Sequence, residues 1–154
     1  MKKSMKILSL VLVLVMAVLS LASCSKYNAL KSAFEKKDYV ENTDLEGTTK
    51  KVQEELEKDN LAVNLHLMTK KGSLTSALII EFKSTEDMKK AYDDSETIKG
   101  LVKDISSNED AKEFQKALED TGYAKGNCLI LPIALSLTPA KDIAEIKDIV
   151  KSVK

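Results

Sequence analysis

Two cysteines and one histidine are the side chains of this 154-residue chain best suited to nucleophilic or metal chemistry. Cys128 begins the apolar run Cys128-Leu129-Ile130-Leu131, and no cation or helix N-terminus that would activate its thiol is evident nearby. We therefore predict that Cys128 is a small buried hydrophobe rather than a reactive thiol. A zinc site needs three or four cysteine or histidine ligands together, and Cys128 with His66 falls short of that set. The sequence predicts no metal and no cofactor.

His66 lies in a segment whose residues alternate between apolar and more polar types, which is the pattern of a half-buried strand. The pattern places His66 with Asn64 and Met68 on the face opposite Leu65 and Leu67. His66 could serve there as a general base or a ligand, but a half-exposed strand residue without chemistry is the favoured interpretation. If the domain binds a partner, we expect this exposed face to be the surface that does so.

Adjacent carboxylates occur in three predicted helices, as Glu54-Glu55, Asp93-Asp94 and Glu109-Asp110. Neighbouring helical residues point about 100° apart, so such pairs serve solvation and the helix dipole rather than acid–base catalysis. No glycine-rich phosphate loop and no Gly-x-Ser-x-Gly elbow occurs among the five glycines. We therefore expect no enzyme. The alternative is a hydrolase-type enzyme in which His66 works with helix carboxylates.

The N-terminus has the three parts of a secretory signal peptide. Lys2, Lys3 and Lys6 precede an apolar run from Ile7 to Leu21, which is short of the roughly 20 residues of a spanning helix. The step Leu21-Ala22-Ser23-Cys24 that ends it resembles the lipobox of bacterial lipoproteins. The resemblance implies that the Cys24 thiol carries a diacylglyceryl group and that a lipoprotein signal peptidase cuts before it.

This resemblance divides the chain into a cleaved signal peptide (1–23), a lipidated cysteine with a short tether (24–26) and one domain (27–154). A diacylglyceryl group brings two acyl chains, which suffice for stable anchoring. We expect a lipid-anchored protein of the cell membrane, facing outside the cytoplasm, with the bilayer and the lipoprotein-processing enzymes as partners. An alternative use of the leader is release of its tail, residues 15–23, as a peptide signal.

Composition narrows the partners further. Removal of three leader lysines leaves 21 basic and 24 acidic residues, a net charge of about −3. This balance argues against nucleic-acid binding, and it assigns membrane attachment to the lipid rather than to electrostatic adhesion. The chain has lysine but no arginine, which indicates an AT-rich genome such as that of a clostridium-like Gram-positive bacterium.

The mature chain predicts an α+β domain with the order α-β-α-β-β-α-α-β-α. Its small, mostly antiparallel sheet consists of a central hairpin at about 61–83 and a late strand at about 128–137, packed by amphipathic helices. Ala77 and Ile79 add apolar residues to the second face of the second hairpin strand, so that strand is the more central. Pro132 cannot donate to a ladder and predicts an edge or a bulge. A helix break is expected near Ser95 or Gly100.

Segments 28–42 and 112–126 share one pattern: an amphipathic helix, a residue that tolerates the left-handed conformation, a tyrosine and extended chain. A true internal repeat and a coincidence of helix-capping chemistry are both open. The domain also resembles small lipoproteins of Gram-positive bacteria through Asp38-Tyr39, Ser84 to Tyr92 and Gly126-Asn127. That resemblance implies no activity. The favoured function is a non-catalytic domain that binds an unidentified protein or small molecule, and the alternative is a structural or assembly role in the envelope.

Overall fold

The computed structural model describes residues 26–43, 48–105 and 114–154. The predicted signal peptide, Cys24 and the start of the helix predicted from residue 107 lie outside the described residues. The elements follow the order α2 (Tyr27–Glu35), β1 (Tyr39–Asn42), α3 (Thr48–Lys58), β2 (Val63–Lys70), β3 (Thr75–Phe82), α4 (Thr85–Asp94), α5 (Glu96–Ile105), α6 (Phe114–Thr121), β4 (Ala124–Lys125), β5 (Cys128–Ala134) and α7 (Pro139–Ser152). This is the predicted α+β class, with one more helix and one more strand than the sequence indicated.

The sheet is entirely antiparallel, with the strand order β1-β2-β3-β5-β4. β3 lies at its centre and is buried on both faces, as its apolar residues on both sides predicted. The hairpin of β2 and β3 pairs Leu67 with Leu78, and Gly72 in its turn has a φ of +69°. A positive φ is a conformation that glycine adopts without steric cost.

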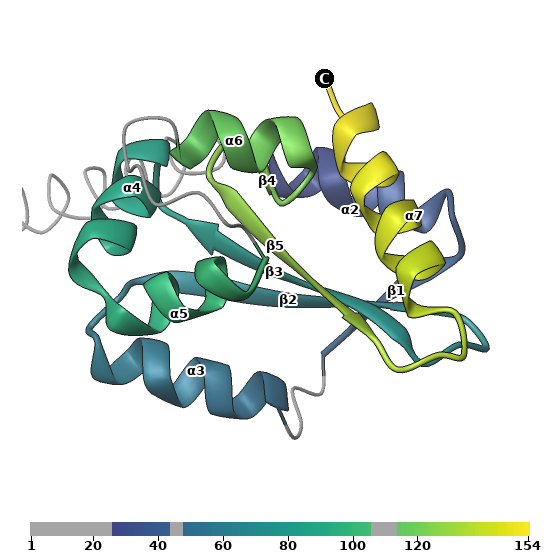
Figure 1. Ribbon diagram of the computed structural model, residues 1–154, viewed down its shortest axis with the longest axis horizontal. Helices are drawn as coiled ribbons and strands as arrows, with labels where there is room; N and C mark the ends of the chain where they lie inside the picture. Colours follow the sequence, from purple (N-terminus) through teal and green to yellow (C-terminus); the bar gives the residue numbers. More distant parts are fainter. Residues whose placement is uncertain (1–25, 44–47, 106–113) are drawn as a thin grey trace, which may run out of the picture.

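Helices cover both faces of the sheet, so the domain has three layers (Figure 1). α2 and α7 pack on the face that carries Met68, Ala77 and Ile79. α3, α4, α5 and α6 contribute to the core on the other face, around Leu78 and Ile80. Adjacent residues of β3 therefore belong to different hydrophobic cores, because successive side chains of a strand point to opposite faces. We call these the α2/α7 layer and the α3–α6 layer.

Pro132 occupies the predicted edge position. The Ile130 N–H donates to the Tyr123 carbonyl, on the side of β5 where β4 lies, at 2.8 Å. The two-residue period of a strand turns the Pro132 nitrogen to the same side. β4 pairs only with Cys128 and Leu129, so β5 is the edge of the sheet at Pro132. The missing N–H therefore costs no hydrogen bond within the sheet. Pro132 also makes this edge less able to pair with a strand of another chain.

The break predicted near Ser95 or Gly100 occurs at Ser95, and Gly100 lies within α5. Ser95 is 3% exposed and has an extended backbone between α4 and α5. Its hydroxyl oxygen accepts a hydrogen bond from the Ile98 N–H at 3.1 Å and donates one to Asp59. A serine oxygen that satisfies an N–H of the first helical turn is an N-cap, so α5 begins as a separate helix.

The two segments with a shared pattern have the same local structure within their described parts. α2 leads to Asp38 with a φ of +63°, and α6 leads to Gly122 with a φ of +82°. A tyrosine follows each of these residues, and the two segments then form β1 and β4, the two edge strands of the sheet. α2 lies in one layer and α6 in the other, so the two segments cover opposite faces.

Candidate functional site

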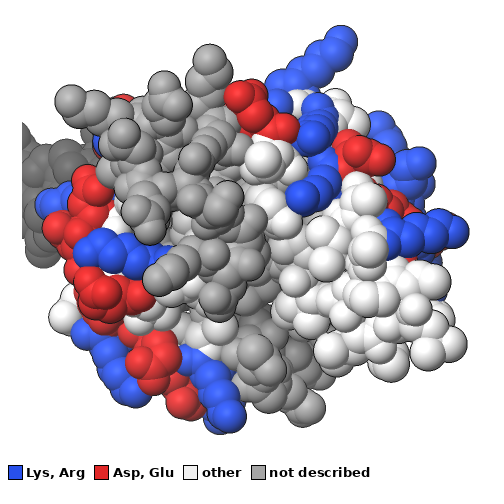
Figure 2. Space-filling view, viewed as in Figure 1, with Lys and Arg blue, Asp and Glu red and all other residues white. Residues whose placement is uncertain are grey.

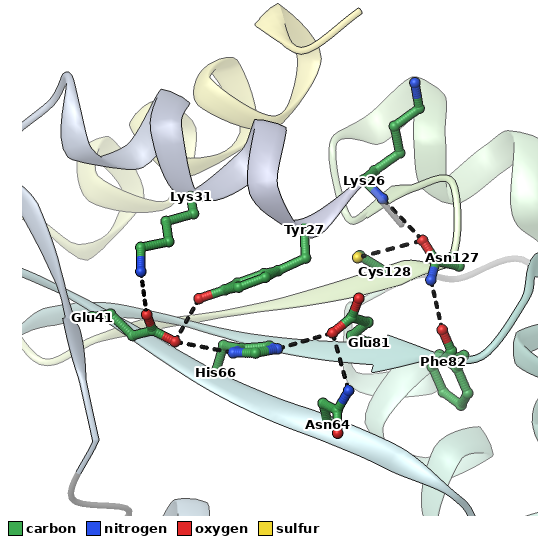
Figure 3. A network of polar contacts seen from close by, with 10 residues as sticks. All are labelled: Lys26, Tyr27, Lys31, Glu41, Asn64, His66, Glu81, Phe82, Asn127 and Cys128. Carbon is green, nitrogen blue, oxygen red and sulfur yellow. Dashed lines mark hydrogen bonds and ion pairs between the residues drawn. The ribbon is translucent and has the colours of Figure 1, made fainter. Parts of the chain in front are cut away.

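The largest polar network in the described chain surrounds His66 on β2, beneath the first turns of α2 (Figure 3). Its Nδ1 lies 3.0 Å from Oε1 of Glu41 on β1, and its Nε2 lies 3.1 Å from Oε2 of Glu81 on β3. The Tyr27 ring stacks on the imidazole with its centroid 3.5 Å away. We call this the His66 cluster, and its members are Tyr27, Lys31, Glu41, Asn64, His66 and Glu81.

Glu41 receives three donors within the His66 cluster. Lys31 Nζ donates to Oε2 at 2.6 Å, and the Tyr27 hydroxyl donates to Oε1 at 2.5 Å. These hydrogen bonds, with that of His66, lower the pKa of Glu41 to about 2. The pKa of the Tyr27 hydroxyl is raised, chiefly by burial and secondly by its hydrogen bond to Glu41. Glu41 is therefore a fixed anion that holds α2 to β1 and β2.

Both ring nitrogens of His66 are occupied by carboxylates. Only the protonated imidazole has two N–H donors, so that form satisfies both contacts at once. The His66 side chain is 18% exposed, and the stacked Tyr27 covers one face of its ring. A general base or metal ligand needs a nitrogen lone pair directed at the reacting group, and here both nitrogens are directed at glutamates. The cluster has the geometry of an interlayer contact.

The expectation that Asn64, His66 and Met68 form an open face is wrong at Met68, which is fully buried in the core with α2 and α7. Asn64 is exposed, and its amide donates to Glu81 at 3.2 Å. The sequence places the three side chains on one face correctly. The sequence shows the apolar helix face of Tyr27, Leu30 and Phe34, and the missed step is that this face needs a second sheet face to bury it.

The carboxylates that contact His66 lie on strands, whereas the enzyme alternative assumed helix carboxylates. Of the predicted pairs, Glu55 bonds Lys58 on the solvated side of α3 at 2.5 Å. Asp93 and Asp94 are exposed at the end of α4, and Glu109-Asp110 lies outside the described residues. Cys128 is fully buried, as predicted, and its sulfur lies 3.8 Å from Asn127 Oδ1.

Asn127 joins three elements at the end of the sheet where the described chain begins, and sequence reasoning missed this role. It is 4% exposed, and its Oδ1 accepts from the Lys26 N–H at 3.1 Å (Figure 3). Its Nδ2 donates to the Phe82 carbonyl at 2.6 Å. A Cβ on Gly126 would lie 2.7 Å from Cγ of Lys26, so the β4–β5 turn also approaches the start of α2 closely. Asn127 therefore fixes where α2 enters the domain.

The surface of the described residues also has a groove and a group of exposed leucines. A groove of about 810 Å³ lies between α2 and α7, with Ala29, Ala33 and Ala144 among the residues that line it. At one end of the sheet three leucines are exposed, at 68% for Leu74, 73% for Leu135 and 102% for Leu137. Exposed apolar groups gathered in one place are typical of interaction surfaces.

No protein-family model, curated protein or solved structure matches this chain. In the described ranges 26–43, 48–105 and 114–154, no three or more histidine, cysteine, aspartate or glutamate side chains are grouped to hold a metal ion. Nor does any helix within those ranges have the length and apolar character needed to cross a bilayer.

Proposed function

We propose that the chain is a membrane-anchored extracytoplasmic lipoprotein whose domain is a non-catalytic binding or interaction domain at the cell surface. The observation that carries this proposal is the sequence Leu21-Ala22-Ser23-Cys24 behind a basic and then apolar leader. The diacylglyceryl group on Cys24 holds the protein to the bilayer, and the domain begins at residue 27. The lipid supplies the anchoring that the mildly acidic domain lacks.

The His66 cluster supports binding over catalysis. Catalysis by His66 requires a nitrogen that exchanges a proton with a substrate, and both of its nitrogens contact glutamates at about 3 Å. Among the described residues, the surfaces available for association include the groove between α2 and α7, the exposed leucines and a smaller pocket of about 360 Å³ lined in part by Asn64 and His66. A domain whose polar side chains bond one another and whose apolar side chains are partly exposed is suited to association rather than to catalysis.

Metabolic labelling with a clickable fatty acid tests the anchor. Wild type is expected to carry the label, and Cys24→Ala is expected to lose it and to leave the membrane fraction. Cys128→Ala is the matched control, since it removes the other cysteine and is expected to keep the label. A wild-type protein without label, isolated from cells that label other lipoproteins, would refute the proposal.

A further inference from the structure

We propose that the α2/α7 layer lies flat on an anionic bilayer, with lysines along its groove at the headgroups and exposed leucines inserted at the end far from the anchor. This inference rests on the proposed lipid anchor at Cys24. It adds an orientation and a second membrane contact that lipidation alone does not require. The contacting surface has two parts, the lysine groove (Lys36, Lys37, Lys141 and Lys154) and the leucine tip (Leu74, Leu135 and Leu137).

The leucine tip is an apolar end on the domain. Leu74 closes the turn between β2 and β3, and its carbonyl accepts from the Leu135 N–H at 3.3 Å. Leu137 is entirely exposed in the connection from β5 to α7. Figure 2 shows an uncharged area at its lower right, where Figure 1 places this turn and this connection. Exposed leucines on loops next to basic side chains are suited to the boundary between headgroups and acyl chains.

The lysine groove carries the charge that an anionic surface requires. Its four lysines come from both ends of the groove, and two acidic residues, Glu145 and Asp148, also line it. Both oxygens of Glu145 bond Lys70 Nζ at 2.7 Å, so that carboxylate is already neutralised. Lysines are visible over α7 at the upper right of Figure 2. Each lysine near an anionic membrane surface adds to the attraction.

The two ends of the α2/α7 layer correspond to the two membrane contacts. Lys26 Nζ donates to the Lys154 carbonyl at 3.2 Å, so α2 begins where α7 ends. Cys24 is two residue steps from Lys26, which gives a reach of about 7 Å. α7 has 14 residues and runs from this end back to the leucine tip, a length of about 21 Å. A bilayer that holds Cys24 is therefore close to the Lys26 end, and the leucine tip contacts the same bilayer when the layer lies parallel to its surface.

Charge selects this face over the opposite one. Helices α2 and α7 contain four lysines and four acidic residues, and their flanks (26, 36–38 and 153–154) add four lysines and one acidic residue. Helices α3 to α6 contain eight lysines and eleven acidic residues. An anionic bilayer attracts the first surface and repels the second. An upright orientation on the Lys26 end would instead leave the leucine tip about 25 Å from the surface, along the eight residues of β3, and free for a protein partner.

Tryptophan fluorescence can test the orientation cleanly because the chain has no tryptophan. The lipidated mature protein carrying Leu137→Trp is reconstituted into vesicles with phosphatidylglycerol and brominated acyl chains. The bromines are expected to quench the fluorescence of this tryptophan. Contact with the membrane is expected to shift its emission to shorter wavelength. Lys90→Trp, at an exposed position of α4, is the matched control and is expected to stay unquenched.

The charge contribution has its own arm. Lys36→Gln, Lys37→Gln and Lys141→Gln are combined in the Leu137→Trp background, all at exposed positions. Three separate changes are each expected to reduce the quenching about fivefold or more: the combined substitution, replacement of the anionic vesicles by neutral phosphatidylcholine vesicles, and high salt.

The possible outcomes separate the two proposals. A lipidated protein whose Leu137→Trp emission is as unquenched as that of Lys90→Trp overturns the flat orientation and leaves the anchor intact. Crosslinking of residue 137 to a protein, without quenching, assigns the leucine tip to a protein partner and also overturns it. A protein without lipid refutes the proposed function instead, before any vesicle is used.

Discussion

The two faces of the sheet are buried by different means. The α3–α6 layer meets the sheet mainly through an apolar cluster centred on Leu78, Ile80 and Leu129, and Glu119 of α6 accepts one hydrogen bond from the Gly126 N–H at 3.0 Å. The α2/α7 layer has an apolar cluster of its own, and adds the His66 cluster and the Asn127 hydrogen bonds. Hydrophobic burial is non-directional, whereas hydrogen bonds fix distance and angle. The comparison teaches that α2 is positioned by specific polar contacts, and these make its attachment sensitive to pH and to single substitutions.

The largest expected effects test whether both layers have a comparable apolar core. Ile79 and Ile80 are adjacent on β3, fully buried, and point into opposite layers. Ile79→Ala and Ile80→Ala should each lower the free energy of unfolding by about 3 kcal/mol, because each removes buried methyl groups and leaves a cavity. Urea denaturation measures both. A loss below about 1 kcal/mol for Ile79→Ala alone would mean that polar contacts, not the apolar core, hold the α2/α7 layer.

Asn127 gives the next largest effect and concerns the α2/α7 layer alone. Asn127→Ala removes the acceptor of the Lys26 N–H and the donor to the Phe82 carbonyl, at a site that is 4% exposed. We expect a loss of about 2 kcal/mol, because buried polar groups lose their partners.

Asn64→Ala is the matched control for this change. Asn64 also donates an amide hydrogen bond, but it is exposed, so its loss should cost about 0.5 kcal/mol or less. Faster amide exchange in the first turn of α2, in Asn127→Ala and not in Asn64→Ala, would show where the effect lies. Equal losses in the two variants would contradict the positioning role of Asn127.

The sequence predicts the elements of both layers better than it predicts their contacts. The alternation around His66 correctly places Asn64 and Met68 beside it, because the period of a strand is a local property. The two glutamates that contact His66 lie 25 residues before it and 15 residues after it, and no local pattern brings them together. Burial of Met68 follows from the packing of α2, which is a tertiary property. Asn127 entered the sequence analysis only as part of the pair Gly126-Asn127 in a resemblance.

Acid should weaken the α2/α7 layer in particular, through Glu41. Its pKa is about 2 in the folded chain against an ordinary 4.5, so it stabilises the fold above pH 4.5 and loses that contribution as the pH falls toward 2. Glu41→Gln should cost about 1–2 kcal/mol at pH 6, and less as the pH falls below 4.5. Urea denaturation of both proteins between pH 6 and pH 3 measures this difference.

Glu55→Gln is the matched control in the α3–α6 layer. Glu55 bonds Lys58 at 2.5 Å, but both side chains are more than half exposed, so the change should cost less than about 0.5 kcal/mol at any pH. The same pH dependence in Glu55→Gln as in Glu41→Gln would mean that acid acts on the whole surface rather than on the His66 cluster.

The smallest expected effect compares the turns that follow α2 and α6. Asp38 and Gly122 both have a positive φ. A Cβ at Gly122 would lie 2.8 Å from the Lys147 carbonyl oxygen, whereas Asp38 is exposed and there is room for its side chain. Close packing therefore requires glycine after α6, while after α2 the cost is only that of a left-handed conformation. Asp38→Gly removes the cost of the left-handed conformation, but glycine's greater freedom in the unfolded chain offsets part of this gain. We expect a net stabilisation of about 0.5 kcal/mol. A small upward shift in the urea midpoint would support this, and destabilisation would mean that the Asp38 side chain contributes more than its backbone costs.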